Sequence, residues 1–152
     1  MIIASVPHTG SRFTQSLFQK KPVFLHVYKG ESIEEIIKHS QIIVPLRHPL
    51  AVAQSWVNRG KPIRWHPKHE AMCVMWRTLI DVVAPLLPMY LPLDLPSRDH
   101  YLHRISAAIG EKLDTDWSTV SDNLPSKPLT DDDKSAVAEL MADPFFAKMG
   151  YL

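Results

Sequence analysis

The stretch IIASVPHTGSRFTQSLF, residues 2–18, decides which fold the chain can adopt. It begins with an apolar run, Ile2–Val6, which breaks at Pro7, reaches Gly10 and continues in a helical pattern. A buried strand, a glycine-containing turn and a helix in this order are typical of a loop that binds phosphate or sulfate through backbone N–H groups and the helix dipole. The GK[ST] ending of a nucleoside-triphosphate loop is missing, because a serine and an arginine follow the glycine.

Three more apolar or β-branched runs predict strands. Val23–Val27 and Gln41–Leu46 are bounded by turn signals and indicate buried parallel strands. Met89–Leu93 predicts an edge strand, because prolines at 88 and 92 limit its hydrogen bonding. Helical patterns fill the gaps at Ser11–Phe18, from Ser32 onward, and at Leu50–Asn58, Lys68–Leu87, Arg98–Lys112 and Thr130–Met141. Strands that alternate with helices predict one α/β domain, residues 1–152, with three layers and a small, mainly parallel sheet flanked by helices.

Local signals mark several helix ends. Ser32 with Glu35, and Thr130 with Asp133, match the pattern of a capping box. Pro85 is expected to end or kink the helix of residues 68–87. The apolar stripe of that helix is expected to lie in the core.

The composition excludes several classes of protein. The chain has 152 residues and a formal net charge of +1 at pH 7, so no global field attracts nucleic acid or an acidic membrane, and any anion site must be local. Cys73 is the only cysteine, which rules out an internal disulfide and a cysteine-based zinc site and predicts a buried structural thiol in a reducing compartment. Without an apolar run of transmembrane length or a signal-peptide pattern, the chain is expected to be cytoplasmic.

The loops after the first three strands carry the candidate site residues. Ligands bind at the carboxyl ends of parallel strands, so these loops are expected to meet along one edge of the sheet. Arg47 ends the third strand and Ser55 lies eight residues further on, so that a guanidinium and a hydroxyl can reach one phosphate. His26 ends the second strand, where an imidazole suits general-base work near neutral pH. Because the third strand ends in arginine rather than a metal-binding aspartate, we expect an anion held without a metal.

Each of these residues also has a structural interpretation. Thr9 can cap the helix of an ordinary strand-to-helix turn, and Arg47 can pair with a carboxylate or cap a helix C-terminus. His26 can be a buried, hydrogen-bonded histidine, and Phe13 can belong to the core. The basic stretch RWHPKH (Arg64–His69) can be a solvated loop, or it can receive an anionic acceptor or help to clamp a cofactor.

Taken together, these motifs resemble those of the sulfotransferases that use 3′-phosphoadenosine 5′-phosphosulfate (PAPS), a family of enzymes with a P-loop fold. The family's first loop reads roughly PKSGTTW, and PHTGSRF (Pro7–Phe13) is similar to it. Its R-x-P-x-x-x-x-x-S pattern is matched by Arg47, Pro49 and Ser55. A catalytic histidine precedes that arginine by a little over twenty residues, as His26 does here. RISAAIG (Arg104–Gly110) and the tail to the final Gly-Tyr resemble the family's closing helices.

The resemblance implies a role for each site residue. The 5′-phosphosulfate would bind at the first loop, Arg47 and Ser55 would bind the 3′-phosphate, and Phe13 would stack on the adenine. His26 would take the acceptor's proton, while His8 and Arg12 would supply positive charge at the leaving phosphate. The cofactor-binding residues would be His8, Thr9, Gly10, Ser11, Arg12, Phe13, Arg47 and Ser55. The acceptor would be a hydroxyl or amine of an unidentified small molecule, glycan or peptide, with no metal.

The chain departs from the family pattern at two places. His8 stands where the loop has a lysine, and no RKG-type clamp for the 3′-phosphate follows, so Arg98, Arg104 and Lys127 are the available substitutes. One alternative is therefore a catalytically inactive sulfotransferase-like protein that binds a nucleotide or a partner. Another is an ATP-dependent phosphotransferase, against which the missing GK[ST] and strand-end aspartate weigh.

Overall fold

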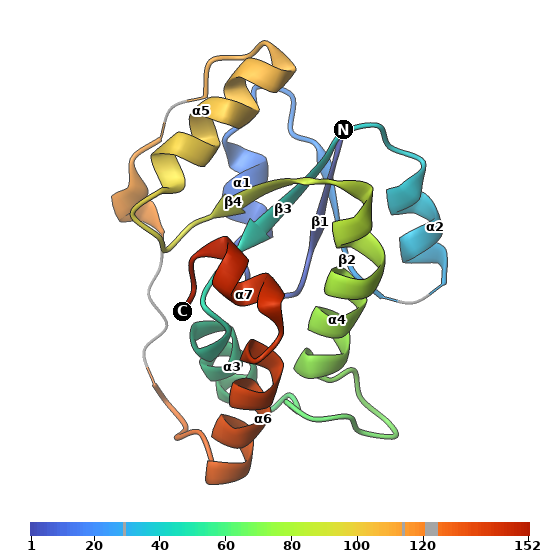
Figure 1. Cartoon of the computed structure of the whole chain (residues 1–152), viewed down its shortest axis with the longest axis vertical. Coiled ribbons are helices and arrows are strands. Elements are labelled where there is room, and N and C mark those ends of the chain that lie inside the picture. Colours follow the sequence, from blue (N-terminus) through green and yellow to red (C-terminus); the bar gives the residue numbers. More distant parts are fainter. Residues whose placement is uncertain (29, 114, 121–124) are drawn as a thin grey trace.

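The sheet has four strands, all parallel, in a computed structural model that describes residues 1–28, 30–113, 115–120 and 125–152. The strands β1 (Ile2–Ser5), β2 (Val23–His26), β3 (Ile42–Leu46) and β4 (Met89–Pro92) are arranged in the order β2-β1-β3-β4 (Figure 1). Ile2 pairs with both Val23 and Ile42, which places β1 inside the sheet. This confirms the predicted α/β class and the edge position of β4, and the sheet is wholly rather than mainly parallel.

Helices cover both faces of this sheet. The α-helices are α1 (Ser11–Ser16), α2 (Glu31–Ile37), α3 (Pro49–Asn58), α4 (Met72–Thr78), α5 (Arg98–Ile109), α6 (Asp131–Met141) and α7 (Pro144–Met149). Figure 1 shows α1 and α5 together on one side and α3, α6 and α7 together on the other. Because side chains alternate along a strand, Ile3 packs with α1 and α5, whereas Ile2 and Ala4 pack with the remaining helices.

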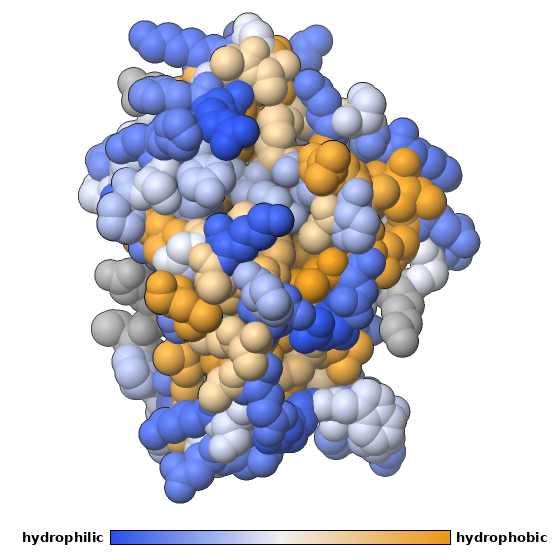
Figure 2. Space-filling view, in the orientation of Figure 1, coloured by the Kyte–Doolittle hydropathy of each residue, from blue (hydrophilic) through white to orange (hydrophobic). Residues whose placement is uncertain are grey.

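The surface is mixed in polarity. Figure 2 shows hydrophilic side chains around most of the outline and hydrophobic ones over the upper end of α4 and over α2. Leu86 and Leu87 after α4, and Ile37 of α2, are exposed. Within the described residues, no helix is both long enough and apolar enough to cross a bilayer.

The predicted capping box at Ser32 and Glu35 is wrong. Helix α2 begins one residue earlier, after Gly30, and no side chain caps it. Ser32 Oγ instead donates to the carbonyl oxygen of His26 at 2.9 Å, so it links α2 to the end of β2. Glu35 interacts along the helix with Lys38 and His39, and is therefore not turned back to the helix start.

The predicted helix 68–87 is three shorter elements. Helix α4 begins only at Met72, because the N–H groups of Met72 and Cys73 donate to the carbonyls of Pro62 and Ile63 in the preceding loop. A π-helical turn, η1 (Leu79–Val83), and a 3₁₀ turn, η2 (Ala84–Leu86), follow. Pro85 lies in η2; it has no N–H for an α-helical bond and its ring crowds the preceding turn, which accounts for the predicted break.

The C-terminal region follows the sequence signals more closely. Thr130 and Asp133 form the predicted capping box at the start of α6. Helix α5 ends at Ile109, three residues earlier than expected, and its C-cap, Gly110, has a left-handed φ of 69°. Helix α1 likewise ends at Ser16 rather than at Phe18. Asp143 then begins α7, whose last turn leads into the buried Tyr151.

Candidate functional site

The carboxyl ends of β1, β2 and β3 and one face of α3 enclose a cleft of about 460 Å³, here called the cationic cleft. It contains every predicted site residue except Thr9. Its lining residues are Pro7, His8, Gly10, Ser11, Arg12, Phe13, Phe24, His26, Arg47, Ser55, Arg59 and Lys61. The sheet therefore brings together the three loops that the sequence placed along one edge, as expected from parallel strands.

Thr9 has a structural position beneath the loop. Its N–H and its hydroxyl both donate to the carbonyl oxygen of Val6, at 3.3 and 2.7 Å, and the residue is fully buried. Gly10, not Thr9, is the N-cap of α1, and no side chain caps this helix. The first backbone N–H groups of α1 are therefore left for water or a ligand.

Gly10 is required by the backbone and by packing. Its φ is 94°, in the left-handed region that disfavours other residues. A Cβ at this position would also clash with the side chain of Leu93, which is fully buried next to the end of β4. The glycine thus lets the loop turn while it packs directly against the neighbouring core.

His8 lies in a buried and positively charged environment. Its ring meets Trp56 edge to face at 6.0 Å, and its buried Nε2 has no hydrogen-bond partner among the described residues. Burial, followed by the charges of Arg59, Lys61 and other cationic groups, lowers the pKa of His8 from 6.5 to about 4. The ring is therefore neutral near pH 7 in the protein without a bound anion; that His8 supplies positive charge beside a bound phosphate stays a prediction.

Arg47 and Ser55 reach the cleft from the β3–α3 connection and are both buried, with 9% and 7% of their surface exposed. His48 fixes this connection in two ways. Its ring nitrogen accepts from the N–H of Leu50 at the start of α3, and its own N–H donates to Asp94 Oδ2 at 2.7 Å. The turn that presents Arg47 is therefore held by bonds on both sides.

His26 lines the cleft beside two aromatic rings. The ring centroids of Phe24 and Tyr28 each lie 5.9 Å from that of His26, and Tyr28 Oη is 3.5 Å from His26 Nδ1. Burial, with a smaller effect of Lys61, lowers the pKa of His26. A neutral imidazole at neutral pH can accept a proton, which a general base requires.

Sequence reasoning missed three lining residues, Phe24, Arg59 and Lys61. Arg59 could have been found, because it follows Ser55 by four residues and so lies on the same face of α3. Lys61 lies beyond the helix and carries no periodic signal; its ammonium lies 5.3 Å from the Trp56 ring centroid.

The proposed substitutes for a clamp, Arg98, Arg104 and Lys127, do not line the cleft. Arg98 packs over Trp117, at 4.6 Å, and Trp117 in turn contacts Phe13 at 5.9 Å. The extra cationic residues that the cleft does contain, Arg59 and Lys61, come from the end of α3 and the turn after it.

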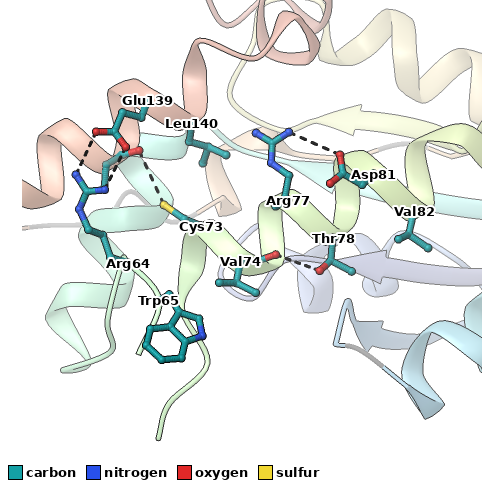
Figure 3. Close-up of a pocket in the computed structure, with 11 residues that line it drawn as sticks. Arg64, Trp65, Cys73, Val74, Arg77, Thr78, Asp81, Val82, Glu139 and Leu140 are labelled. Atoms are coloured by element: carbon teal, nitrogen blue, oxygen red, sulfur yellow. Dashed lines mark hydrogen bonds and ion pairs between the residues drawn. The ribbon is translucent and has the colours of Figure 1, made fainter. Parts of the chain in front are cut away.

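The cleft concentrates positive charge without a matching acid. Arg12, Arg47, Arg59 and Lys61 line it, and none of its described lining residues is a carboxylate. A second hollow, between α4 and α6, shows the opposite arrangement (Figure 3). There Arg64 pairs with Glu139, and Arg77 pairs with Asp81, so its positive charges are compensated. The described lining of this cleft is thus strongly basic, although the net charge of the chain is only +1.

Compared with models of known families, with curated proteins and with solved structures, the chain matches none of them. Its function therefore has to be inferred from the chemistry of the cationic cleft.

Proposed function

We propose that the protein is a sulfotransferase that binds PAPS in the cationic cleft and passes its sulfuryl group to a hydroxyl or amine. One observation carries the proposal. Four cationic side chains, a glycine-containing loop and a neutral histidine line a single cleft at the ends of parallel strands, and no described carboxylate lies among them. A ligand with several phosphate groups fits such a cleft, because its charges would be compensated by fixed donors.

The residues of the cleft can be divided between the two ends of the cofactor. Arg47 and Ser55 are buried together, so they would bind the 3′-phosphate as a guanidinium and a hydroxyl donor. The loop around Gly10 would bind the 5′-phosphosulfate with backbone N–H groups and Arg12. Phe13, which rests on Trp117, would offer a ring face to the adenine. Arg59 and Lys61 would add charge that the family obtains from its RKG-type clamp.

The chemistry follows from these positions. When bound, PAPS supplies a sulfuryl group whose bond to the 5′-phosphate oxygen breaks as a bond to the acceptor oxygen or nitrogen forms. His26 would take the proton that the acceptor loses. Arg12 would stabilise the charge that develops on the leaving phosphate, and a neutral His8 would add a hydrogen bond rather than a charge.

The neutral His8 also supports a second candidate function. Without the positive charge that a loop lysine would supply, the cleft could bind the 3′,5′-bisphosphate and catalyse nothing, as in a nucleotide-binding or interaction protein. An ATP-dependent phosphotransferase is less well supported, because such enzymes hold Mg²⁺ with a carboxylate and none is found among the described lining residues. Binding and turnover measurements separate these candidates.

Binding of the 3′,5′-bisphosphate product tests the cofactor. We expect it to raise the melting temperature more than AMP or Mg-ATP does. Arg47→Ala should weaken bisphosphate binding about 10- to 100-fold, since charge-assisted hydrogen bonds are lost, and should weaken AMP binding far less. Arg104→Ala, an exposed change outside the cleft, is the matched control. Equal losses for the bisphosphate and AMP would remove the 3′-phosphate assignment.

Transfer from labelled PAPS tests the chemistry. His26→Ala should abolish turnover and leave bisphosphate affinity within about twofold, because its role is proton transfer. If the unmodified protein binds the bisphosphate tightly but transfers no sulfuryl group to any acceptor offered, the inactive binding protein is the better description.

A further inference from the structure

Two more hollows continue outward from the cationic cleft. The first, of about 230 Å³, shares Pro7 and Lys61 with the cleft. The second, of about 390 Å³, shares Tyr28, His69 and Glu70 with the first. We call the two together the outer groove. The loop between α3 and α4 forms its outer wall. Because neighbouring hollows share lining residues, the outer groove connects this loop with the cleft.

The outer groove leads to the proposed base. Tyr28 lines both of its hollows, and Tyr28 Oη lies 3.5 Å from His26 Nδ1. His26 itself lines the cationic cleft. A molecule bound in the outer groove would therefore contact Tyr28, beside His26. This is where the acceptor of a transferred group has to lie if His26 is to take its proton.

The walls of the outer groove combine flat rings with polar groups. Trp65 is 73% exposed, which is unusual for a large aromatic side chain, and the rings of His66 and His69 lie 4.9 Å apart at 32°. Lys68 and Glu70 stand between and beside these rings as a donor and an acceptor of hydrogen bonds. Glu70 is the one carboxylate among the described residues that line the outer groove.

We propose that the outer groove binds the acceptor and that this acceptor is a saccharide. A sugar ring has an apolar C–H face, which packs on exposed aromatic rings, and hydroxyl groups, which need both donors and acceptors. A plain phenol would cover the rings but offers a single hydroxyl to the two polar groups, Glu70 and Lys68. A larger hollow of about 390 Å³ lies within the range of small-molecule sites. The inference rests on the proposed function, since the cationic cleft supplies the group that is transferred.

The side chain of Trp65 is not packed into the core, because most of it is exposed to solvent. In Figure 3 it stands at the border of the other hollow, clear of the Arg64–Glu139 ion pair. It lines that hollow and the larger hollow of the outer groove, and it makes no hydrogen bond or ring contact within the described residues. Its exposed ring face is available to stack on a ligand.

Saturation-transfer NMR with lactose tests the outer groove without any need for turnover. The full chain should transfer saturation to the lactose protons, in the presence and in the absence of the 3′,5′-bisphosphate. Trp65→Ala and Glu70→Gln should each weaken lactose binding about five- to tenfold, the effect of losing one ring contact or one hydrogen bond. Glu34→Gln, an exposed change on α2 away from all three hollows, is the matched control and should change nothing.

The same variants separate this inference from the proposed function. With lactose as acceptor and labelled PAPS, Trp65→Ala and Glu70→Gln should raise KM about five- to tenfold while kcat and bisphosphate affinity stay within about twofold. Binding of para-nitrophenol instead of lactose, lost in Trp65→Ala, would overturn the saccharide assignment. If neither substitution changes the affinity for lactose, the outer groove is not the lactose site. Lactose binding without bisphosphate binding would support the groove and contradict the proposed cofactor.

Discussion

His8 and Gly10 both have left-handed backbone in the first loop, at φ values of 70° and 94°. Gly10 adopts this conformation without strain, whereas a histidine adopts it at a cost. Strain at a non-glycine residue is commonly kept where a side chain has to be held in one place. His8 combines this backbone strain with a half-buried imidazole near several cationic groups. Both features lie in the lining of the cationic cleft.

His8 should make the folded protein sensitive to acid. The pKa of His8 is about 4 in the folded state and 6.5 in the unfolded chain. Between pH 4 and pH 6.5, His8 is therefore protonated in the unfolded chain but neutral in the folded protein. Stability should therefore fall as pH falls from about 6.5 to about 4. His8→Asn, which tolerates a left-handed backbone, should flatten this part of the profile. Urea unfolding at several pH values measures it.

An unchanged slope between pH 6.5 and 4 in His8→Asn would show that other groups cause the acid sensitivity. His103→Asn is the matched control, because His103 is an exposed residue of α5 outside the cationic cleft.

At the scale of elements, two similar sequence signals lead to different contacts. Thr130 and Asp133 exchange hydrogen bonds with each other's backbone N–H groups, at 3.0 and 3.1 Å, and start α6. Ser32 begins the same kind of pattern, but its hydroxyl bonds the carbonyl of His26 on the neighbouring strand. The Ser32 hydroxyl thus bonds an acceptor on the neighbouring strand instead of capping the helix, and Gly30 is the N-cap of α2.

Thr130→Ala should lower the free energy of unfolding by about 1 kcal/mol, the usual effect of losing an N-cap side chain. Chemical denaturation measures it. Thr130→Ser keeps the hydroxyl and should recover most of the loss. If alanine and serine prove equally stable, the capping box contributes nothing to the stability of α6.

At the scale of the whole molecule, the C-terminal segment closes onto the sheet edge that carries the site. Tyr151 Oη donates to Asp94 Oδ1 at 2.8 Å, and the other oxygen of Asp94 accepts from the N–H of His48. The rings of His48 and Tyr151 meet edge to face at 5.8 Å. The end of the chain, the segment after β4 and the start of α3 are thereby tied together next to Arg47.

Tyr151→Phe should cost about 1–2 kcal/mol of stability, because one hydrogen bond to a carboxylate is lost from a buried hydroxyl. It should also weaken bisphosphate binding modestly, about two- to fivefold, if the tie positions the turn that presents Arg47. Tyr90→Phe is the control for stability, because the Tyr90 hydroxyl has no hydrogen-bond partner in the described part of the chain. Full bisphosphate affinity in Tyr151→Phe would limit the tie to a structural role.

Much of the architecture could be predicted from local pattern. Apolar runs and helical stripes located all four strands and most helices, because burial on a strand or helix imposes a period on the sequence. The errors fell where non-neighbouring groups competed, as at Ser32 and at the late start of α4, whose first N–H groups donate to Pro62 and Ile63. The end of a helix depends on hydrogen bonds to residues outside it, and these cannot be predicted from the local sequence.

The sequence by itself determined that the Gly10 loop, His26, Arg47 and Ser55 would meet, because parallel strands bring their carboxyl ends to one edge of the sheet. Only the tertiary structure decided that His8 is neutral, that Lys61 joins the basic lining, and that an outer groove runs from Pro7 and Lys61, at the cleft, to the loop before α4. Burial and electric field at a residue depend on side chains that lie far away along the chain, and no local pattern encodes them.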